Sequence, residues 1–193
     1  MARAFVIMGV SGSGKTSVAK MLSESLKCSF LEADEFHSQS NKEKMNKGIP
    51  LCDEDRIPWL EALRDAIGRK LVSGETAVLA CSALQKRYRE ILRSADPDYV
   101  VGDFDCCKIK FICLVAPVEE LAERMNMRSE KGEHFMPASL LKSQLELLQI
   151  FDYERIPQID STMNLQSILD RVLNLIDCEL DCVAESLLFS ADC

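Results

Sequence analysis

The sequence lacks any long hydrophobic run: no apolar stretch in its 193 residues approaches the roughly 18 residues that a membrane-spanning helix needs. It also lacks an excess of basic residues, with 23 Lys and Arg against 31 Asp and Glu, for a net charge of −8. Broad binding to nucleic acid or to an anionic membrane surface requires basic faces, so we expect neither partner. The first residues, Met1 to Ala4, lead straight into an apolar segment, so we expect no targeting peptide. We therefore expect a cytoplasmic protein.

Metal-ligand spacing is also missing. The chain has only two histidines. Among its nine cysteines, Cys178 and Cys182 could form one half of a zinc site, but no second pair has a similar spacing. A structural zinc site is therefore disfavoured. Hydrophobic residues make up 47% of the chain, and this length suits one domain with a substantial core. We expect a single domain over residues 1–180 and an acidic tail without Lys or Arg over residues 181–193.

The strongest motif in the chain is Gly-x4-Gly-Lys-Thr over residues 9–16, which is the pattern of a P-loop. Its glycines permit a loop that wraps phosphate with backbone N–H groups, at the N-terminus of a following helix. Lys15 can reach the β- and γ-phosphates, and Thr16 can offer its hydroxyl to Mg²⁺. A Gly/Ser-rich turn with a surface lysine is the alternative, and the four fixed positions argue against it. The expected nucleotide-binding residues are Gly9, Ser11, Gly12, Ser13, Gly14, Lys15, Thr16 and Ser17.

Apolar strand-like segments alternate with segments of helical periodicity along the chain. This alternation predicts an α/β fold with a mostly parallel sheet and helices on both faces. The expected strands are residues 4–9, 29–33, 76–81, 108–115 and 155–160. The expected helices are residues 15–27, 85–94, 117–127 and 164–180, with a long one from Asp53 to about Ser73 and another that starts at Pro137.

Two polar residues, Asp34 and His37, follow the second expected strand. Ligands of open α/β sheets bind beyond the carboxyl ends of the strands, so both should lie near the P-loop. Asp34 is the candidate to orient or deprotonate an attacking hydroxyl, or to hold a Mg²⁺-bound water. The alternative is an aspartate that caps a turn after a strand. His37 is a candidate hydrogen-bond partner for a polar substrate, or else an ordinary packed histidine.

Arg56, Lys86 and Arg89 form a candidate basic cluster, because each falls just beyond an expected strand or loop end. Arginine binds carboxylates in a fixed, bidentate geometry, and such a cluster in an acidic protein favours an anionic substrate. The alternative is that these are solvated helix charges, which is the interpretation we prefer for Arg87 and Arg93.

A second pair of arginines, Arg124 and Arg128, lies four residues apart at the start of a segment that interrupts the apolar pattern. We predict a mobile lid over about residues 124–137. In a lid the two arginines would act in catalysis by stabilising transition-state charge, Arg124 would also contact the nucleotide, and His134 would anchor the closed state. A helix with exposed arginines is the alternative.

Several further blocks carry a family resemblance. They are Asp34 to His37, Asn41 to Met45, Gly48 to Leu51, Asp53 to Leu60, Cys81 to Leu84, Tyr88-Arg89, His134 to Pro137 and Ser143-Gln144. Together with the P-loop, and over about residues 4–176, they resemble the gluconokinase family, which uses ATP to make 6-phosphogluconate from D-gluconate.

The resemblance implies a fold like that of adenylate or shikimate kinase, with five parallel strands in the order 2-3-1-4-5. It also implies Mg·ATP as the phosphoryl donor, transfer to the C6 hydroxyl of D-gluconate, and commonly a homodimer. It supports Asp34, His37 and the basic cluster as substrate-side residues, with Lys15 at the phosphates. The chain has Gln85 where the family often has lysine, so one cationic contact is missing. Another small acceptor, such as shikimate or a nucleoside monophosphate, and a non-catalytic nucleotide switch are the alternatives.

Overall fold

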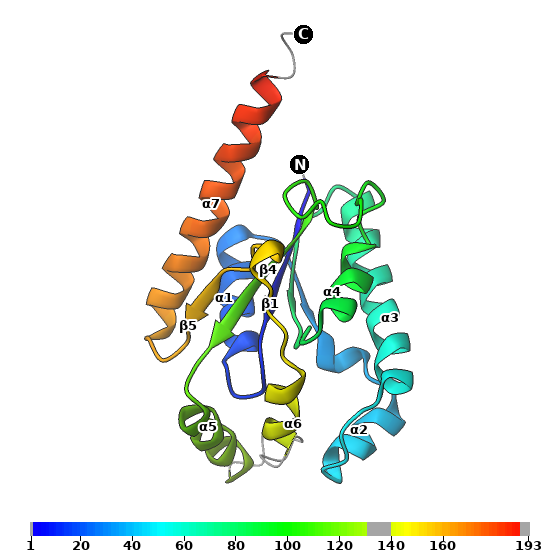
Figure 1. Ribbon diagram of the computed structural model, residues 1–193. Helices are drawn as coiled ribbons and strands as arrows, with labels where there is room; N and C mark the ends of the chain where they lie inside the picture. The colour runs from blue at the N-terminus through cyan, green and yellow to red at the C-terminus, as the bar shows by residue number, and fades with distance from the viewer. Residues whose placement is uncertain (1, 131–139, 190–193) are drawn as a thin grey trace.

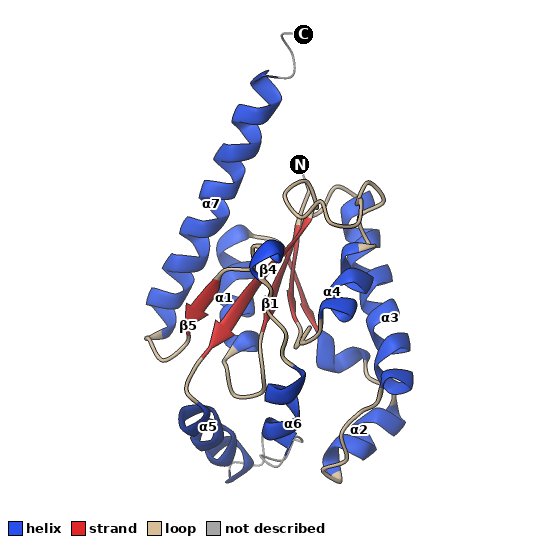
Figure 2. Cartoon of the chain, in the orientation of Figure 1, coloured by secondary structure: helices blue, strands red, loops and turns tan. Residues whose placement is uncertain are grey.

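The computed structural model describes residues 2–130 and 140–189. Its centre is a five-stranded sheet in the order β2-β3-β1-β4-β5, and every pair of neighbouring strands is parallel. Figure 2 shows the strands fanned between two groups of helices. The strands are β1 (Ala4–Met8), β2 (Ser29–Glu32), β3 (Ala77–Ala80), β4 (Ile109–Val115) and β5 (Gln158–Asp160). The predicted sheet and strand order are confirmed.

Helices cover both faces of this sheet (Figure 1). One face carries α1 (Lys15–Leu26) and α7 (Leu165–Phe189), and the other carries α3 (Asp53–Val72) and α4 (Lys86–Arg93). The remaining helices gather near the carboxyl ends of the strands. They are α2 (Gln39–Asn46), α5 (Val118–Glu130) and α6 (Leu140–Leu147), and the 3₁₀ turn η1 (Ala33–Phe36) directly follows β2. A second 3₁₀ turn, η2 (Asp152–Glu154), instead precedes β5.

The side chains of β1 contact the helices on both faces of the sheet. Successive side chains of a strand point to opposite faces. Val6 and Met8 accordingly pack in the core against α3 and α4, whereas Phe5 and Ile7 pack in the core against α1 and α7. All five residues of β1 are buried, so the strand that leads into the P-loop is fixed from both sides.

Some element boundaries differ from the sequence predictions. β2 ends at Glu32 because the next four residues turn into η1, and β5 begins only at Gln158. α7 continues to Phe189, so the helix runs on through much of the segment that we had separated as a tail. Figure 1 shows its C-terminal end extending away from the sheet. The predicted helix start at Pro137 lies outside the described residues. No helix in the described ranges has the length and apolar character to cross a membrane.

The P-loop connects β1 to α1 through glycines at positive φ: 139° at Gly9, 83° at Gly12 and 88° at Gly14. A Cβ atom on Gly9 would lie 2.6 Å from the carbonyl oxygen of Leu114, the penultimate residue of β4. One on Gly12 would lie 2.8 Å from the carbonyl oxygen of Leu121 in α5. Backbone atoms cannot move aside as a flexible side chain can, so glycine is required where the loop meets β4 and α5.

We predict that Gly9→Ala destabilises the fold by about 2 kcal/mol or more, because it combines backbone strain with a clash against a fixed carbonyl. Gly74→Ala is the matched control, since Gly74 also has positive φ (76°) but has open space where its Cβ would lie. Urea unfolding followed by circular dichroism measures both. Equal losses in the two variants would show that the contact with Leu114 is not a packing constraint.

Candidate active site

A cleft opens where β1, β2 and β3 end, between the P-loop and the segment that runs from η1 to α3. Many residues singled out from the sequence meet there, from elements far apart in the chain. The sequence-predicted residues that line the cleft are Ser11, Gly12, Gly14, Lys15, Thr16, Asp34, His37, Arg56 and Arg128.

Lys15 is the first residue of α1, and its side chain lies at the base of the cleft. The ammonium group donates a hydrogen bond to the carbonyl oxygen of Val10 at 2.8 Å. Burial lowers the pKa of Lys15, and the nearby carboxylates of Asp34 and Glu32 oppose that shift. The N-cap of this helix is Gly14, which has no side chain to cap it, so the first N–H groups of α1 can bind an anion.

Glu32, the last residue of β2, is a site residue that the sequence analysis missed. Its carboxylate accepts a hydrogen bond from the hydroxyl of Thr16, and burial raises its pKa, with a further upward contribution from Asp34. Two carboxylates separated by one residue therefore face the P-loop. The Glu-x-Asp spacing at a strand end was the available signal, but Glu32 was taken as an ordinary strand residue.

His37 lies on the opposite side of the cleft and stacks on Trp59, with ring centroids 4.2 Å apart and planes 15° from parallel. The indole N–H of Trp59 donates to the carbonyl oxygen of Ala33 at 2.7 Å, which ties α3 to η1 beneath the stack. Burial lowers the pKa of His37 to about 4, so the ring is neutral near pH 7. Trp59 also lines the cleft, and it is a second residue that the sequence analysis did not place at the site.

Arg56 is the member of the basic cluster that reaches the cleft. Its Nε donates to the carbonyl oxygen of Leu51 at 3.1 Å, and its guanidinium lies 5.8 Å from the ring centroid of Tyr88. Within the described ranges, its terminal nitrogens have no hydrogen-bond partner. These contacts orient the group while leaving two N–H-bearing nitrogens for a ligand.

Arg89 does not reach the cleft, contrary to our expectation of a substrate contact. The side chain is fully buried, and its nitrogens donate to both carboxylate oxygens of Glu154 and to the carbonyl oxygens of Ala83, Leu84 and Gln149. Its donors are therefore already used inside the protein, and no part of it lines the cleft. Arg89 instead holds the loop after β3 through these carbonyls, at a point where Ala83 has a positive φ of 44°.

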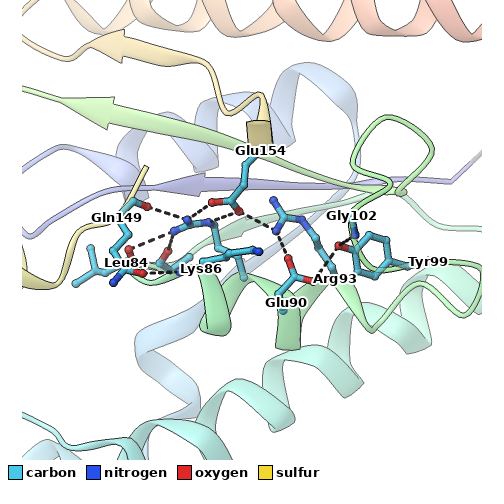
Figure 3. Close-up of polar contacts among 10 residues, drawn as sticks. Leu84, Lys86, Glu90, Arg93, Tyr99, Gly102, Gln149 and Glu154 are labelled. Atoms are coloured by element: carbon cyan, nitrogen blue, oxygen red, sulfur yellow. Dashed lines mark hydrogen bonds and ion pairs between the residues drawn. The ribbon is translucent and has the colours of Figure 1, made fainter. Parts of the chain in front are cut away.

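Arg93 corrects a second expectation, because it is 2% exposed and not a solvated helix charge. It donates to Glu90 at 2.7 Å and to Glu154 at 2.9 Å, as Figure 3 shows. Its guanidinium lies between the rings of Phe104 and Phe111, 4.5 and 4.8 Å from their centroids. Arg87, by contrast, is exposed as expected.

Lys86 also lies away from the cleft lining. Its ammonium nitrogen sits 5.1 Å from the ring centroid of Tyr153, and its backbone N–H donates to the side chain of Gln149. Arg124 points toward the end of β5, where it donates to Glu120 and to the carbonyl oxygen of Ser161, both at 3.0 Å. In this conformation neither side chain faces the P-loop.

The other predicted residues divide as follows. Arg128 lines the cleft from the last turn of α5. Ser13 is buried within the P-loop, and Ser17 is exposed on α1. Gly9 lies behind the cleft lining, against β4. His134, within the predicted lid, lies outside the described residues.

Gln144 of α6 contributes a contact that the sequence analysis did not assign. Its side-chain carbonyl accepts a hydrogen bond from the backbone N–H of Ser11 at 2.7 Å, and the side chain is 7% exposed. The neighbouring Ser143 also lines the cleft. α6 is thus joined directly to the P-loop. The Ser143-Gln144 block was part of the family resemblance, but no chemical pattern indicated what it does.

The chain is similar to known proteins over most of its length. A family model described as an AAA domain matches residues 5–150. A gluconokinase of Arabidopsis thaliana is 47% identical over 174 residues, covering 90% of this chain and 92% of that protein. The crystal structure of a gluconokinase from Sinorhizobium meliloti superposes with a TM-score of 0.74 at 39% identity, covering 97% of both chains. A shikimate kinase from Aquifex aeolicus, with a TM-score of 0.55, 14% identity and coverage of 92% and 98%, shares the fold.

We predict that Glu154→Gln lowers the free energy of unfolding by about 3 kcal/mol, because it leaves Arg89 buried without an anion and Arg93 with Glu90 as its remaining carboxylate partner. Glu61→Gln, which removes an exposed carboxylate 4.0 Å from Arg64, should cost less than about 1 kcal/mol. Urea unfolding at neutral pH compares the two variants. A loss for Glu154→Gln no larger than for the control would show that the buried cluster does not hold the loop after β3.

Proposed function

This chain belongs to the gluconokinase family, and from that premise we propose that it transfers the γ-phosphoryl group of ATP to the C6 hydroxyl of D-gluconate. The observation that carries the proposal is the cleft itself. It places a phosphate loop with the half-buried Lys15 opposite a carboxylate, Asp34, and a guanidinium, Arg56, whose terminal nitrogens have no partner among the described residues. A phosphoryl donor, an attacking hydroxyl and an anionic acceptor each find a matching group there.

The oxygen donors at the end of β2 fit a magnesium ion. Mg²⁺ prefers oxygen ligands and is usually held by one or two carboxylates together with substrate phosphates and waters. Thr16 and Asp34 are the predicted ligands, and the hydrogen bond from Thr16 to Glu32 adds a second carboxylate beside the P-loop hydroxyl. When bound, the ion supplies positive charge to the β- and γ-phosphate oxygens. We assign Thr16 and Glu32 to holding it, directly or through water.

This assignment leaves Asp34 for the acceptor. Asp34 follows Glu32 by two residues, and its charge acts on both Lys15 and His37, so it lies between the phosphate side and the far side of the cleft. In the proposed reaction the C6 oxygen attacks the γ-phosphorus, and the bond between that phosphorus and the β,γ-bridging oxygen breaks. The hydroxyl proton passes to Asp34, and ADP leaves. Lys15 stabilises the charge on the phosphates throughout.

The acceptor's carboxylate belongs with Arg56 in this proposal. The terminal nitrogens of Arg56 have no partner in the described part of the chain, and its Nε contact fixes its orientation, which suits bidentate binding of a carboxylate. Arg128 faces the cleft near the P-loop, and we assign it to the transferring phosphoryl group. Arg124 would have to leave Glu120 to join it. The cytoplasmic location, the lid and the homodimer remain predictions.

The direct test of substrate identity is ADP release from Mg·ATP with a panel of acceptors: D-gluconate, related sugar acids, shikimate and nucleoside monophosphates. We expect release with D-gluconate and a product one phosphoryl group heavier by mass spectrometry. Turnover with a different acceptor, and none with D-gluconate, would support the kinase activity but contradict the proposed substrate. ATP binding without any product would instead favour a nucleotide switch.

We predict that Asp34→Asn lowers kcat with gluconate by about 10²- to 10⁴-fold, since the amide cannot accept the hydroxyl proton. ATP affinity, measured by calorimetry, should change little. Glu35→Gln is the matched control, because Glu35 is an exposed neighbouring carboxylate outside the cleft lining.

Glu32→Gln distinguishes the role of Glu32 from that of Asp34. We predict that it raises the Mg²⁺ concentration needed for half-maximal rate. Asp34→Asn should leave that concentration near the wild-type value. The opposite pattern would exchange the roles that we assign to Glu32 and Asp34. An unchanged kcat for Asp34→Asn would remove this residue from the mechanism.

A further inference from the structure

The ring of His37 has two nitrogens in different surroundings. Nδ1 faces the side-chain amide nitrogen of Asn41 at 3.5 Å. Nε2 has no hydrogen-bond partner within the described part of the chain, and it is not fully buried. His37 lines the cleft, so Nε2 is the ring nitrogen open to it.

The orientation of the Asn41 amide is fixed by a second contact. Its nitrogen donates to the carbonyl oxygen of Asp55 at 2.9 Å, and the side chain is 4% exposed. A backbone carbonyl only accepts hydrogen bonds, so the NH₂ group of Asn41, and not its oxygen, must lie on this side. The second N–H of the same nitrogen is then the one available to His37.

A donor facing Nδ1 requires that Nδ1 be the acceptor. In a neutral imidazole one nitrogen accepts while the other carries the proton. We propose that Asn41 is a positioning residue that holds His37 as the neutral Nε2–H tautomer, so that an uncharged N–H donor faces the hydroxyl groups of the acceptor. This inference rests on the proposed function for the identity of the acceptor. The tautomer itself depends only on the contacts of Asn41.

The charges around His37 agree with a neutral ring. Asp34 from η1 favours the imidazolium, whereas Lys42 from α2 and Arg56 from α3 oppose it, and burial is the largest influence. Trp59 contributes only its ring face. A neutral donor beside Arg56 binds hydroxyl oxygens without adding a second cation, which leaves carboxylate recognition to the arginine.

The tautomer can be read directly by long-range ¹H–¹⁵N correlation NMR on protein labelled at histidine nitrogens. The chain has only two histidines, His37 and His134, so a His134→Gln variant assigns the signals. We expect Nε2 to be protonated and Nδ1 unprotonated at pH 7. A protonated Nδ1, either as the other tautomer or as imidazolium, would overturn the proposal whatever the enzyme's substrate.

Asn41→Asp tests the positioning role, because a carboxylate accepts where the amide donates. It should place the proton on Nδ1 and raise the pKa of His37. The KM for gluconate should rise about tenfold or more and become pH-dependent, while the KM for ATP stays within about twofold. Asn46→Asp makes the same chemical change at an exposed position of α2 and should alter neither the tautomer nor the kinetics.

In Asn41→Asp the new carboxylate faces the carbonyl oxygen of Asp55, and this repulsion could unfold the variant. Asn41→Ala is therefore a second test that introduces no such repulsion. It should give a mixture of His37 tautomers and an intermediate rise in KM for gluconate. If both variants retain the wild-type tautomer and KM, Asn41 does not position His37. If the wild type shows the expected tautomer but does not phosphorylate gluconate, the proposed function fails and the positioning role stands.

Discussion

The partly buried ammonium group of Lys15, at the phosphate loop, is the constraint on which the rest of the site depends. An ammonium group removed from water needs compensation, and here burial lowers its pKa while nearby carboxylates oppose that change. The protein supplies the carbonyl of Val10 and the carboxylates of Glu32 and Asp34. The same carboxylates are the groups that we assign to the metal and to the acceptor hydroxyl. The electrostatic balance around Lys15 and the proposed chemistry of the cleft thus rest on the same few residues.

The arginines of the molecule divide by whether their donors are already used. Arg89 is held by Glu154 and by backbone carbonyls, and Arg93 by Glu154 and Glu90, in a buried cluster that links α4, η2 and the loop after β3. Figure 3 shows the contacts of Arg93 with both carboxylates. Arg56 and Arg128 face the cleft. The buried pair acts on the site indirectly, because the carbonyl of Ser82 in the loop after β3 accepts a hydrogen bond from the N–H of Gly9, where the P-loop begins. Arginine therefore has two roles in this protein: one pair is buried and holds the scaffold, and the other pair faces the cleft.

The sequence predicted the features that follow from local patterns and from the geometry of parallel sheets. The P-loop and the position of Asp34 are examples, since the carboxyl ends of parallel strands meet at one edge. It did not predict the burial of Arg89, because helical spacing says nothing about a partner 65 residues further along the chain. Glu32 was missed because its role comes from contact with Thr16 and not from its strand. Gln144 needed the packing of α6 on the P-loop, which no periodicity reports.

The central claim is that the acceptor lies between Asp34 and Arg56, with its hydroxyl directed at the P-loop. A crystal structure with D-gluconate, Mg²⁺ and a non-hydrolysable ATP analogue tests it most directly. We predict the C6 oxygen within hydrogen-bond distance of Asp34 and in line with the γ-phosphorus, the substrate carboxylate on Arg56, and Nε2 of His37 on a substrate hydroxyl. A gluconate molecule bound with its carboxylate toward the P-loop, or away from both Asp34 and Arg56, would contradict this account.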